Sequence, residues 1–209
     1  MLAIAGGKGG TGKTTTALGL AGALDCPTLV ADTDADMPNL HALAGVAREP
    51  TLADLDGRPP TALAQPQPGV DGVSVLPAPR PTDDADVHAA LSRLSDASVP
   101  AVVDCPGGAG PDAAVPLRAA DRAVVVATPC APALHDAAKT AAMARALGTD
   151  VVGALLTRAA TAPAGVADLL GCRVLGTVPD VDPPVLERDV VRTAYARLAS
   201  GGRTGEEIL

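Results

Sequence analysis

A glycine-rich run near the N-terminus carries two of the three lysines of the chain, Lys8 and Lys13. Residues 7–14 fit the pattern GxxxxGK[ST], in which glycines let backbone N–H groups turn toward the oxygens of a bound phosphate. The pattern predicts that Lys13 reaches the β- and γ-phosphates of a nucleotide and that the Thr14 hydroxyl binds Mg²⁺. The alternative is a glycine-rich turn that only starts a helix. The residues expected to bind the phosphates are Gly7, Lys8, Gly9, Gly10, Thr11, Gly12, Lys13, Thr14 and Thr15.

Three aspartates lie where apolar runs end. Asp32 ends the second run, Asp34 follows it, and Asp104 ends a later run. Ligands of open parallel sheets bind outside the carboxyl ends of the strands, so we expect these carboxylates beside the glycine-rich run. Carboxylates next to a triphosphate are useful only with a metal ion, a positioned water or a lysine that offsets the repulsion. We therefore expect Asp104 to hold Mg²⁺ through water.

Short apolar runs alternate with helical patterns along most of the chain. The runs are rich in Val and Leu without strict polar alternation, which is typical of buried parallel strands. We expect strands at residues 2–5, 28–32, 73–76, 101–104, 123–128, 151–157 and 173–178. We expect helices at residues 13–23, 86–94, 112–120, 133–147, 164–170 and 184–198. This order predicts an α/β fold: an open, mostly parallel sheet of seven or eight strands with helices on both faces.

The remaining segments are expected to be irregular. Residues 48–81 are rich in Pro and Gly and are predicted to cross the surface with one short helix near residues 51–55. Asp36 is suited to cap a short helix that follows it. Residues 200–209 are glycine-rich and polar and are expected to fray. The length predicts that residues 1–209 form a single domain.

The composition argues against several classes of function. A net charge of −8 is a poor electrostatic match for DNA or anionic lipid. The chain has no Trp or Phe and one Tyr, Tyr195, which argues against a base-stacking surface for single-stranded nucleic acid. It shows no apolar run of about 18 residues, no signal peptide and no CxxC, so we expect a cytoplasmic protein with reduced thiols. The acidic, lysine-poor composition suits a halophile, haloarchaea included, and a GC-rich genome would give the same bias.

The sequence KGGTGKT at residues 8–14 is a deviant Walker A motif, and the chain resembles the MinD/ParA family of ATPases. The segment from Asp32 to Asn39 resembles that family's DxDxxxxN segment. The resemblance implies a P-loop NTPase fold of the SIMIBI class with ATP and Mg²⁺ as cofactors. It implies that Lys8 reaches across a dimer interface to the other subunit's nucleotide. It also implies that Asp34 orients the attacking water and that Asp32 supports Mg²⁺ through water. The implied catalytic residues are Lys8, Lys13 and Asp34, and the metal-binding residues are Thr14, Asp32 and Asp104.

The second half of the chain carries weaker motifs. By the same resemblance, Arg158 lies near the adenine, and Pro179, Asp180 and Val181 form a loop whose backbone reads the base. The alternative is ordinary turn chemistry at strand ends, because Pro and Asp favour turns in any protein.

Together with these motifs, the resemblance implies a Mg²⁺-dependent ATPase with slow turnover. Two subunits are expected to close face to face around two ATP molecules, and hydrolysis is expected to open this ATP-driven homodimer. The dimer would position a cargo or machine, with an unidentified protein as activator. Three alternatives stay open: a metabolic enzyme of the dethiobiotin-synthetase or cobyrinic-acid-amidation type, an iron–sulfur assembly carrier, and a non-hydrolysing nucleotide-binding regulator.

The C-terminal residues depart from MinD-type members, which use a basic amphipathic helix to bind membranes. Gly201 and Gly202 interrupt the pattern, and Glu206 and Glu207 carry the wrong charge for anionic lipid. We therefore expect no membrane binding, and the net charge and lack of an Arg/Lys cluster predict no DNA binding.

Overall fold

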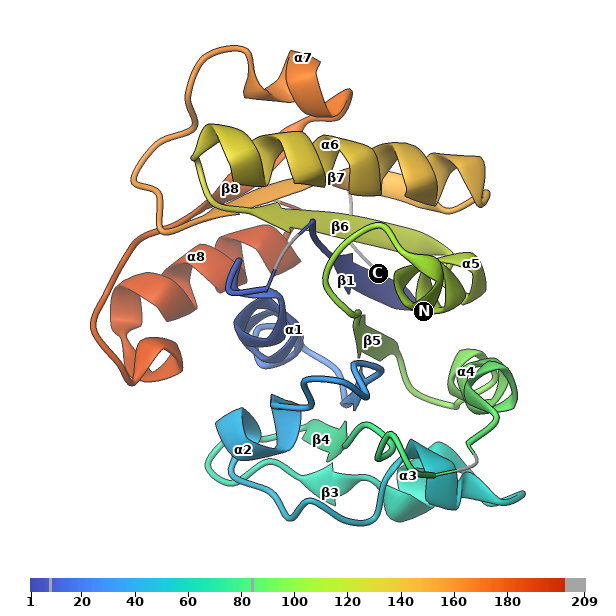
Figure 1. Ribbon diagram of the computed structural model, residues 1–209. Coiled ribbons are helices and arrows are strands. Elements are labelled where there is room, and N and C mark those ends of the chain that lie inside the picture. The colour runs from blue at the N-terminus through green and yellow to red at the C-terminus, as the bar shows by residue number, and fades with distance from the viewer. Residues whose placement is uncertain (8, 84, 202–209) are drawn as a thin grey trace.

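The computed structural model describes residues 1–7, 9–83 and 85–201. Within these residues, the fold is built on one eight-stranded sheet with the strand order β3-β4-β2-β5-β1-β6-β7-β8 (Figure 1). Neighbouring strands are parallel except at one edge, where β3 pairs antiparallel with β4. The strands are β1 (Leu2–Ala5), β2 (Thr28–Asp32), β3 (Gln65–Pro66), β4 (Val73–Leu76), β5 (Ala101–Asp104), β6 (Arg122–Ala127), β7 (Asp150–Thr157) and β8 (Val174–Val178).

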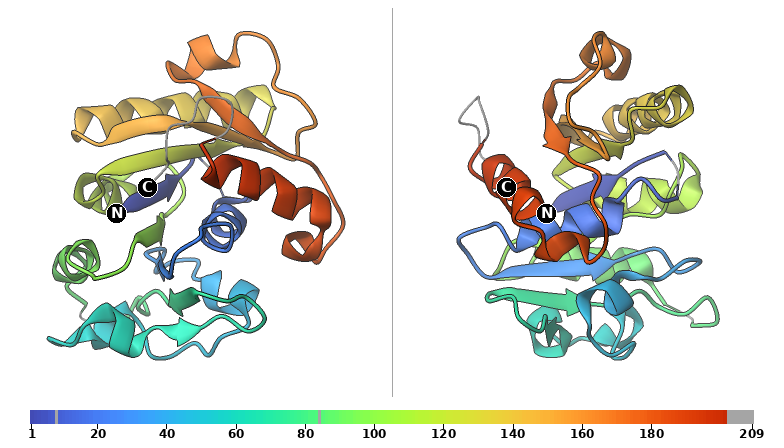
Figure 2. Two further views of the ribbon diagram at one scale, coloured as in Figure 1. Left: turned by 180° about the vertical axis from the view of Figure 1, so that it is seen from behind. Right: turned by 90° about the vertical axis from the view of Figure 1, so that its left-hand side faces the viewer.

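Helices cover both faces of this sheet, as the two views of Figure 2 show. The helices α1, α2 and α8 pack on one face, and α4, α5, α6 and α7 pack on the other. None of the helices that the structure describes is long and apolar enough to cross a membrane. The helices are α1 (Lys13–Ala21), α2 (Leu40–Ala44), α3 (Pro60–Leu63), α4 (Val87–Ser95), α5 (Pro111–Ala119), α6 (Ala131–Ala146), α7 (Val166–Leu170) and α8 (Asp189–Ala199), with 3₁₀ turns η1 (Leu52–Leu55) and η2 (Val185–Glu187).

The central strand β1 shows how an almost aromatic-free chain builds its core. Its side chains alternate between the two faces, as the pleat of a strand requires. Leu2 and Ile4 join the cluster under α1 and α8, whereas Ala3 and Ala5 join the cluster under α4 and α5. Because every residue of β1 is buried, the strand reads in the sequence as a continuous apolar run.

The single aromatic residue joins α8 to α1. Tyr195 in α8 is 1% exposed, and its phenol oxygen lies 3.2 Å from Oγ1 of Thr16 in α1. The ring presses on the backbone of α1, because a Cβ on Gly19 would lie 2.3 Å from a ring carbon. Helix α8 therefore packs directly against α1, the helix that begins with Lys13.

The structure confirms the predicted α/β fold with an open, mostly parallel sheet. The seven expected strands lie within one residue of their predicted bounds at each end. The last helix was predicted from residue 184, but α8 begins at Asp189. Residues 185–187 form the 3₁₀ turn η2, and Arg188 has the extended angles φ −78° and ψ 126°, which separate this turn from the helix.

Two expectations for the connecting segments are wrong in part. Residues 48–81 contain the short turn predicted near residue 51 as η1, but they also contain α3 and the edge strand β3. Asp36 caps no helix, because α2 begins later, at Leu40, after Asn39. The predicted fraying of residues 200–209 falls mostly on residues 202–209, outside the described part of the chain.

Candidate functional site

The glycine loop, residues 6–12 between β1 and α1, has no room for a side chain at Gly6 or Gly7. A Cβ on Gly6 would lie 2.5 Å from the carbonyl oxygen of Val126, and a Cβ on Gly7 would lie 2.3 Å from Cβ of Asp136 in α6. Gly12 has a φ of 87°, a left-handed conformation that favours glycine. Backbone geometry alone therefore requires glycine at several points of the loop. Lys8 lies outside the described residues.

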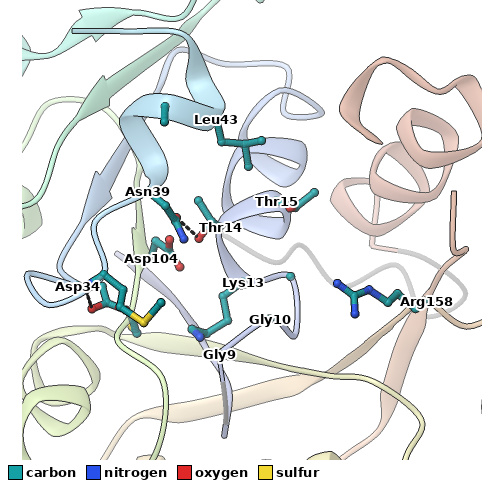
Figure 3. A pocket seen from close by; sticks show the side chains of 14 residues that line it. Gly9, Gly10, Lys13, Thr14, Thr15, Asp34, Asn39, Leu43, Asp104 and Arg158 are labelled. Atoms are coloured by element: carbon teal, nitrogen blue, oxygen red, sulfur yellow. Dashed lines mark hydrogen bonds between the residues drawn. The ribbon is translucent and has the colours of Figure 1, made fainter. Parts of the chain in front are cut away.

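A cavity of about 540 Å³ opens over the glycine loop (Figure 3). Gly9 and Gly10 face open space, because a Cβ on either residue would have no atom within 4 Å. Lys13 is only 8% exposed and lines the cavity. The cavity therefore combines accessible backbone with a buried cation, which is the chemistry that binds phosphate. Of the residues expected to bind nucleotide or metal, those that line it are Gly9, Gly10, Gly12, Lys13, Thr14, Thr15, Asp34, Asp104 and Arg158.

The other expected residues lie outside this lining. Thr11 attaches the glycine loop to the end of β7. Its carbonyl oxygen accepts a hydrogen bond of 2.6 Å from the Thr157 hydroxyl there. The methyl carbon Cγ2 of Thr157 also lies 3.3 Å from where a Cβ on Gly12 would be. The residues outside the lining are Gly7, Thr11, Asp32, Pro179, Asp180 and Val181.

Asp32 organises the segment that follows β2. Its Oδ1 accepts a hydrogen bond from the N–H of Asp34 at 2.9 Å, and its Oδ2 accepts one from the N–H of Leu40 at 3.3 Å. Burial raises the pKa of Asp32 to about 6, although these backbone hydrogen bonds oppose the rise. Both oxygens are thus engaged with the chain, and a water-mediated contact from Asp32 to Mg²⁺ stays a prediction.

Asp104 lies directly beside Asp32, because these residues are paired across β5 and β2. Asp104 is 3% exposed, and its Oδ1 has no hydrogen-bond partner. Burial raises its pKa to about 7, the charge of Asp32 adds to the rise, and the Thr14 side chain and Lys13 oppose it. A buried carboxylate oxygen without a partner is costly unless something binds it.

A hydrated Mg²⁺ ion held between phosphate and protein fits this arrangement. The Thr14 hydroxyl and the unpartnered oxygen of Asp104 are oxygen ligands of the kind Mg²⁺ prefers. Within the described part of the chain, no group of three or more His, Cys, Asp or Glu residues forms a metal site of its own. The remaining ligands would therefore have to be water and phosphate oxygens, which is usual for Mg²⁺ in nucleotide sites.

The segment from Asp34 to Asn39 passes along the edge of the cavity. Oδ1 of Asp34 accepts a hydrogen bond of 3.0 Å from the N–H of Met37. Oδ1 of Asn39 accepts one of 2.8 Å from the Thr14 hydroxyl, drawn as a dashed line in Figure 3. Sequence reasoning placed Asn39 in a motif but gave it no role. The motif spacing was the available signal, but the contact joins residues 25 positions apart.

Arg158 enters the cavity from the far side. It has a φ of 51°, and its side chain reaches toward the glycine loop (Figure 3). Its Nε lies 4.0 Å from Oδ1 of Asp180, and both side chains are exposed. Asp180 thus lies next to a residue that lines the cavity. Base recognition by Arg158 and by residues 179–181 stays a prediction.

Comparisons with known proteins show the family to which the chain belongs. A family model described as the CobQ/CobB/MinD/ParA nucleotide binding domain matches residues 2–183. An uncharacterised ATP-binding protein of Methanocaldococcus jannaschii is 33% identical over 199 residues, which cover 88% of this chain and 75% of that protein.

Solved structures of MinD are similar over almost the whole chain. The septum site-determining protein MinD of Pyrococcus horikoshii, complexed with Mg-ADP, has a TM-score of 0.83 and 26% identity, covering 95% of this chain and 93% of that one. The cell division ATPase MinD of Pyrococcus furiosus has a TM-score of 0.80 and 27% identity, covering 96% of each chain. These matches confirm the resemblance on which the sequence analysis relied. The chain belongs to the CobQ/CobB/MinD/ParA family of nucleotide-binding domains.

Proposed function

We propose that this protein is a Mg²⁺-dependent ATPase that acts as an ATP-driven homodimeric switch. The observation that carries the proposal is the meeting of Lys13, Thr14 and the unpartnered Oδ1 of Asp104 at one cavity. Together they supply a cation for phosphate oxygens, a hydroxyl for a metal ion and a carboxylate for its waters. Two relatives support it, because one is described as ATP-binding and another was solved with Mg-ADP.

Each residue has a part in this proposal. Lys13 and the N–H groups at the start of α1 bind the β- and γ-phosphates and stabilise the charge that grows on the bridging oxygen. Mg²⁺, when bound, neutralises negative charge on the phosphate oxygens. Asp34, which lines the same cavity as Lys13 and Thr14, orients the water that attacks the γ-phosphate. Arg158 and residues 179–181 bind the base of the nucleotide. Hydrolysis of ATP is slow.

The dimer part of the proposal is supported by the rim of the cavity. Met37 is 70% exposed and Leu43 is 48% exposed, and both line the cavity. Large apolar side chains that face water beside a ligand site are a common mark of an interaction surface. A second copy that closes over this rim covers both side chains and excludes water from the phosphates. Lys8 then reaches the other subunit's nucleotide.

The cargo and the activator are proposed to be proteins of the cytoplasm. An acidic chain with a net charge of −8 attracts neither DNA nor an anionic membrane surface. MinC in complex with MinD of Aquifex aeolicus is an example of a protein partner bound to a chain of the same fold.

Size-exclusion chromatography with light scattering tests the proposal. Asp34→Ala should form a dimer with Mg²⁺ and ATP, because the variant binds ATP but cannot hydrolyse it. Wild type with ADP should stay monomeric at the same salt concentration. Lys8→Ala in the Asp34→Ala background should abolish the dimer. Asp36→Ala is the matched control, since Asp36 is exposed in the same segment and does not line the cavity.

The outcomes separate the proposal from its main rival. An ATP-specific dimer that depends on Lys8 supports the switch. A monomer in every state, with ATP bound, contradicts it and points to an ATP-dependent metabolic enzyme with a small-molecule substrate on the same fold.

A further inference from the structure

Asn39 occupies the N-cap position of α2 but does not cap the helix. An asparagine at this position ordinarily accepts a hydrogen bond from an N–H group of the first helical turn. Here no side-chain cap is formed, and Oδ1 of Asn39 accepts its hydrogen bond from the Thr14 hydroxyl instead. The Leu40 N–H at the start of α2 donates to Asp32. Asp32 thus takes over part of the capping role and leaves the Asn39 side chain available for Thr14.

This contact controls the direction of the Thr14 hydroxyl. A threonine hydroxyl has one proton to donate and two lone pairs to offer. In this structure the proton points to Asn39 at 2.8 Å, so the lone pairs of the Thr14 oxygen are left for another partner. The side chain of Asp104 lies beside the same hydroxyl and is the competing acceptor for its proton, because a hydrogen bond from Thr14 lowers the pKa of Asp104 (Figure 3). An oxygen held in this way is prepared to bind a cation, while Asn39 keeps the proton turned away.

Asn39 also belongs to the segment that forms the rim of the cavity. It is separated by one residue from Met37, whose N–H donates to Asp34. It directly precedes α2, which carries the exposed Leu43. The Thr14–Asn39 hydrogen bond therefore links the position of Thr14 to residues 34–43. This segment includes the carboxylate of Asp34 and the exposed side chains of Met37 and Leu43.

We propose that Asn39 is a positioning residue that orients the Thr14 hydroxyl for Mg²⁺ and transmits occupation of the metal site to residues 34–43. The inference rests on the proposed function, because it requires Mg²⁺–nucleotide at Thr14. It adds a residue of the cavity lining that acts on the metal through Thr14, and it assigns the 34–43 segment as the part of the chain that reports the metal.

The absence of tryptophan makes the proposal directly measurable. A Met37→Trp variant carries the only Trp of the chain, at an exposed point of the rim. Two quantities are measured in this parent: the ATP dissociation constant by equilibrium dialysis, with Mg²⁺ and with EDTA, and the Trp emission under the same conditions. The ratio of the dissociation constant with EDTA to the dissociation constant with Mg²⁺ isolates the contribution of the metal to ATP binding.

Asn39→Ala in this parent should lower that ratio about tenfold, the usual size of an effect on metal binding that acts through a ligand's hydrogen-bond partner. It should also abolish the Mg²⁺-dependent change in Trp emission. Asn39→Asp keeps the acceptor oxygen and should retain both responses. On a Thr14→Val background, Asn39→Ala should have no further effect on the ratio, because the hydroxyl it positions is gone. Asp36→Ala is the control and should behave like the parent.

The possible failures are distinct. If the parent binds ATP with a Mg²⁺-dependent gain but Asn39→Ala leaves the ratio and the emission change intact, the inference about Asn39 is wrong and the proposed function stands. If Asn39→Ala lowers the ratio equally with and without the Thr14 hydroxyl, Asn39 acts elsewhere and the inference is again wrong. If the parent shows no Mg²⁺-dependent ATP binding, the proposed function and the inference are both overturned.

Discussion

Thr157 at the end of β7 and Thr11 in the glycine loop are joined by a hydrogen bond of 2.6 Å between a buried hydroxyl and a main-chain carbonyl oxygen. The two residues are 146 positions apart in the sequence. The bond turns the Thr11 carbonyl toward the sheet, away from the cavity. A carbonyl that faced the cavity would repel phosphate oxygens, so this contact helps the glycine loop to present N–H groups instead.

Thr157→Val should weaken ATP binding and lower stability. The substitution keeps the shape of the side chain but leaves the Thr11 carbonyl without its donor, at a cost of about 1–3 kcal/mol. Thr157→Ser retains the hydroxyl and should stay close to wild type in ATP affinity. Calorimetric titration with ATP and thermal unfolding measure both effects. Equal ATP affinity in wild type and Thr157→Val would show that the bond does not shape the loop.

Lys13→Ala should reduce ATP affinity about 10- to 150-fold, the effect of losing a hydrogen bond of 1.5–3 kcal/mol to a charged group. Lys139 offers a matched control, because its ammonium group pairs with Asp136 on α6 and its side chain is 59% exposed. Lys139→Ala should bind ATP like wild type. Calorimetric titration of both variants with ATP measures the two affinities. A comparable loss of ATP affinity in both would mean that the overall charge of the protein, and not the position of Lys13, is responsible.

Asp104→Asn should stabilise the ligand-free protein at neutral pH. The folded pKa of about 7 lies above the ordinary value of 3.8, so between these pH values the folded state binds more protons than the unfolded state. Stability then falls as the pH rises through this window. The raised pKa of Asp32 acts in the same direction. Asn cannot ionise, so the variant should lose much of this dependence.

Asp104→Asn should raise the free energy of unfolding by about 2–4 kcal/mol at pH 8 and by close to zero at pH 4. This range follows from about 1.4 kcal/mol for each unit by which the pKa is raised. Urea unfolding at the two pH values measures it. The same variant should lose Mg²⁺-dependent ATP binding, a trade between stability and function. Asp180→Asn, at an exposed carboxylate, is the control for a general charge effect. A flat stability profile in wild type would mean that Asp104 is already ionised without a ligand.

Gly19→Ala should destabilise the protein, although alanine is ordinarily the better helix former by about 1 kcal/mol. The new Cβ would lie 2.3 Å from the ring of Tyr195, so α8 must move away from α1. We expect a loss of about 1–3 kcal/mol, as for other overpacked cores. Gly22→Ala is the comparison, because its Cβ would lie 3.3 Å from the end of the Val70 side chain and 3.4 Å from the carbonyl oxygen of Leu18, much farther than the contact at Gly19. Thermal unfolding should show a clearly lower melting temperature for Gly19→Ala than for Gly22→Ala.

The sequence predicted the parallel part of the sheet well because of burial. A strand covered on both faces must be apolar throughout, so β1, β2 and β5 stand out as short runs that end in small or acidic residues. The edge strand β3 has only Gln65 and Pro66, and neither pattern nor propensity marks it. Its existence depends on the free edge of β4, which is a tertiary property.

The candidate site was predictable where it is local in sequence. The glycine loop and Lys13 form one continuous motif, and the aspartates end recognisable strands. Contacts between distant segments could not be predicted, among them the bonds of Asn39 to Thr14 and of Thr157 to Thr11. The error at Asp36 has the same origin. Capping rules consider neighbours a few positions away, but the Leu40 N–H finds its acceptor eight residues earlier, at Asp32.

Tyr195 gives the wild-type protein a native optical reporter. Because the chain has no Trp or Phe, its near-ultraviolet absorbance and intrinsic fluorescence come from this one ring. The ring is buried between α8 and α1 and contacts Thr16, three residues after Lys13. Fluorescence quenching or near-ultraviolet circular dichroism therefore observes one known contact, without a label. Protein concentration, for the same reason, is better measured from peptide-bond absorbance than from the weak signal of a single tyrosine.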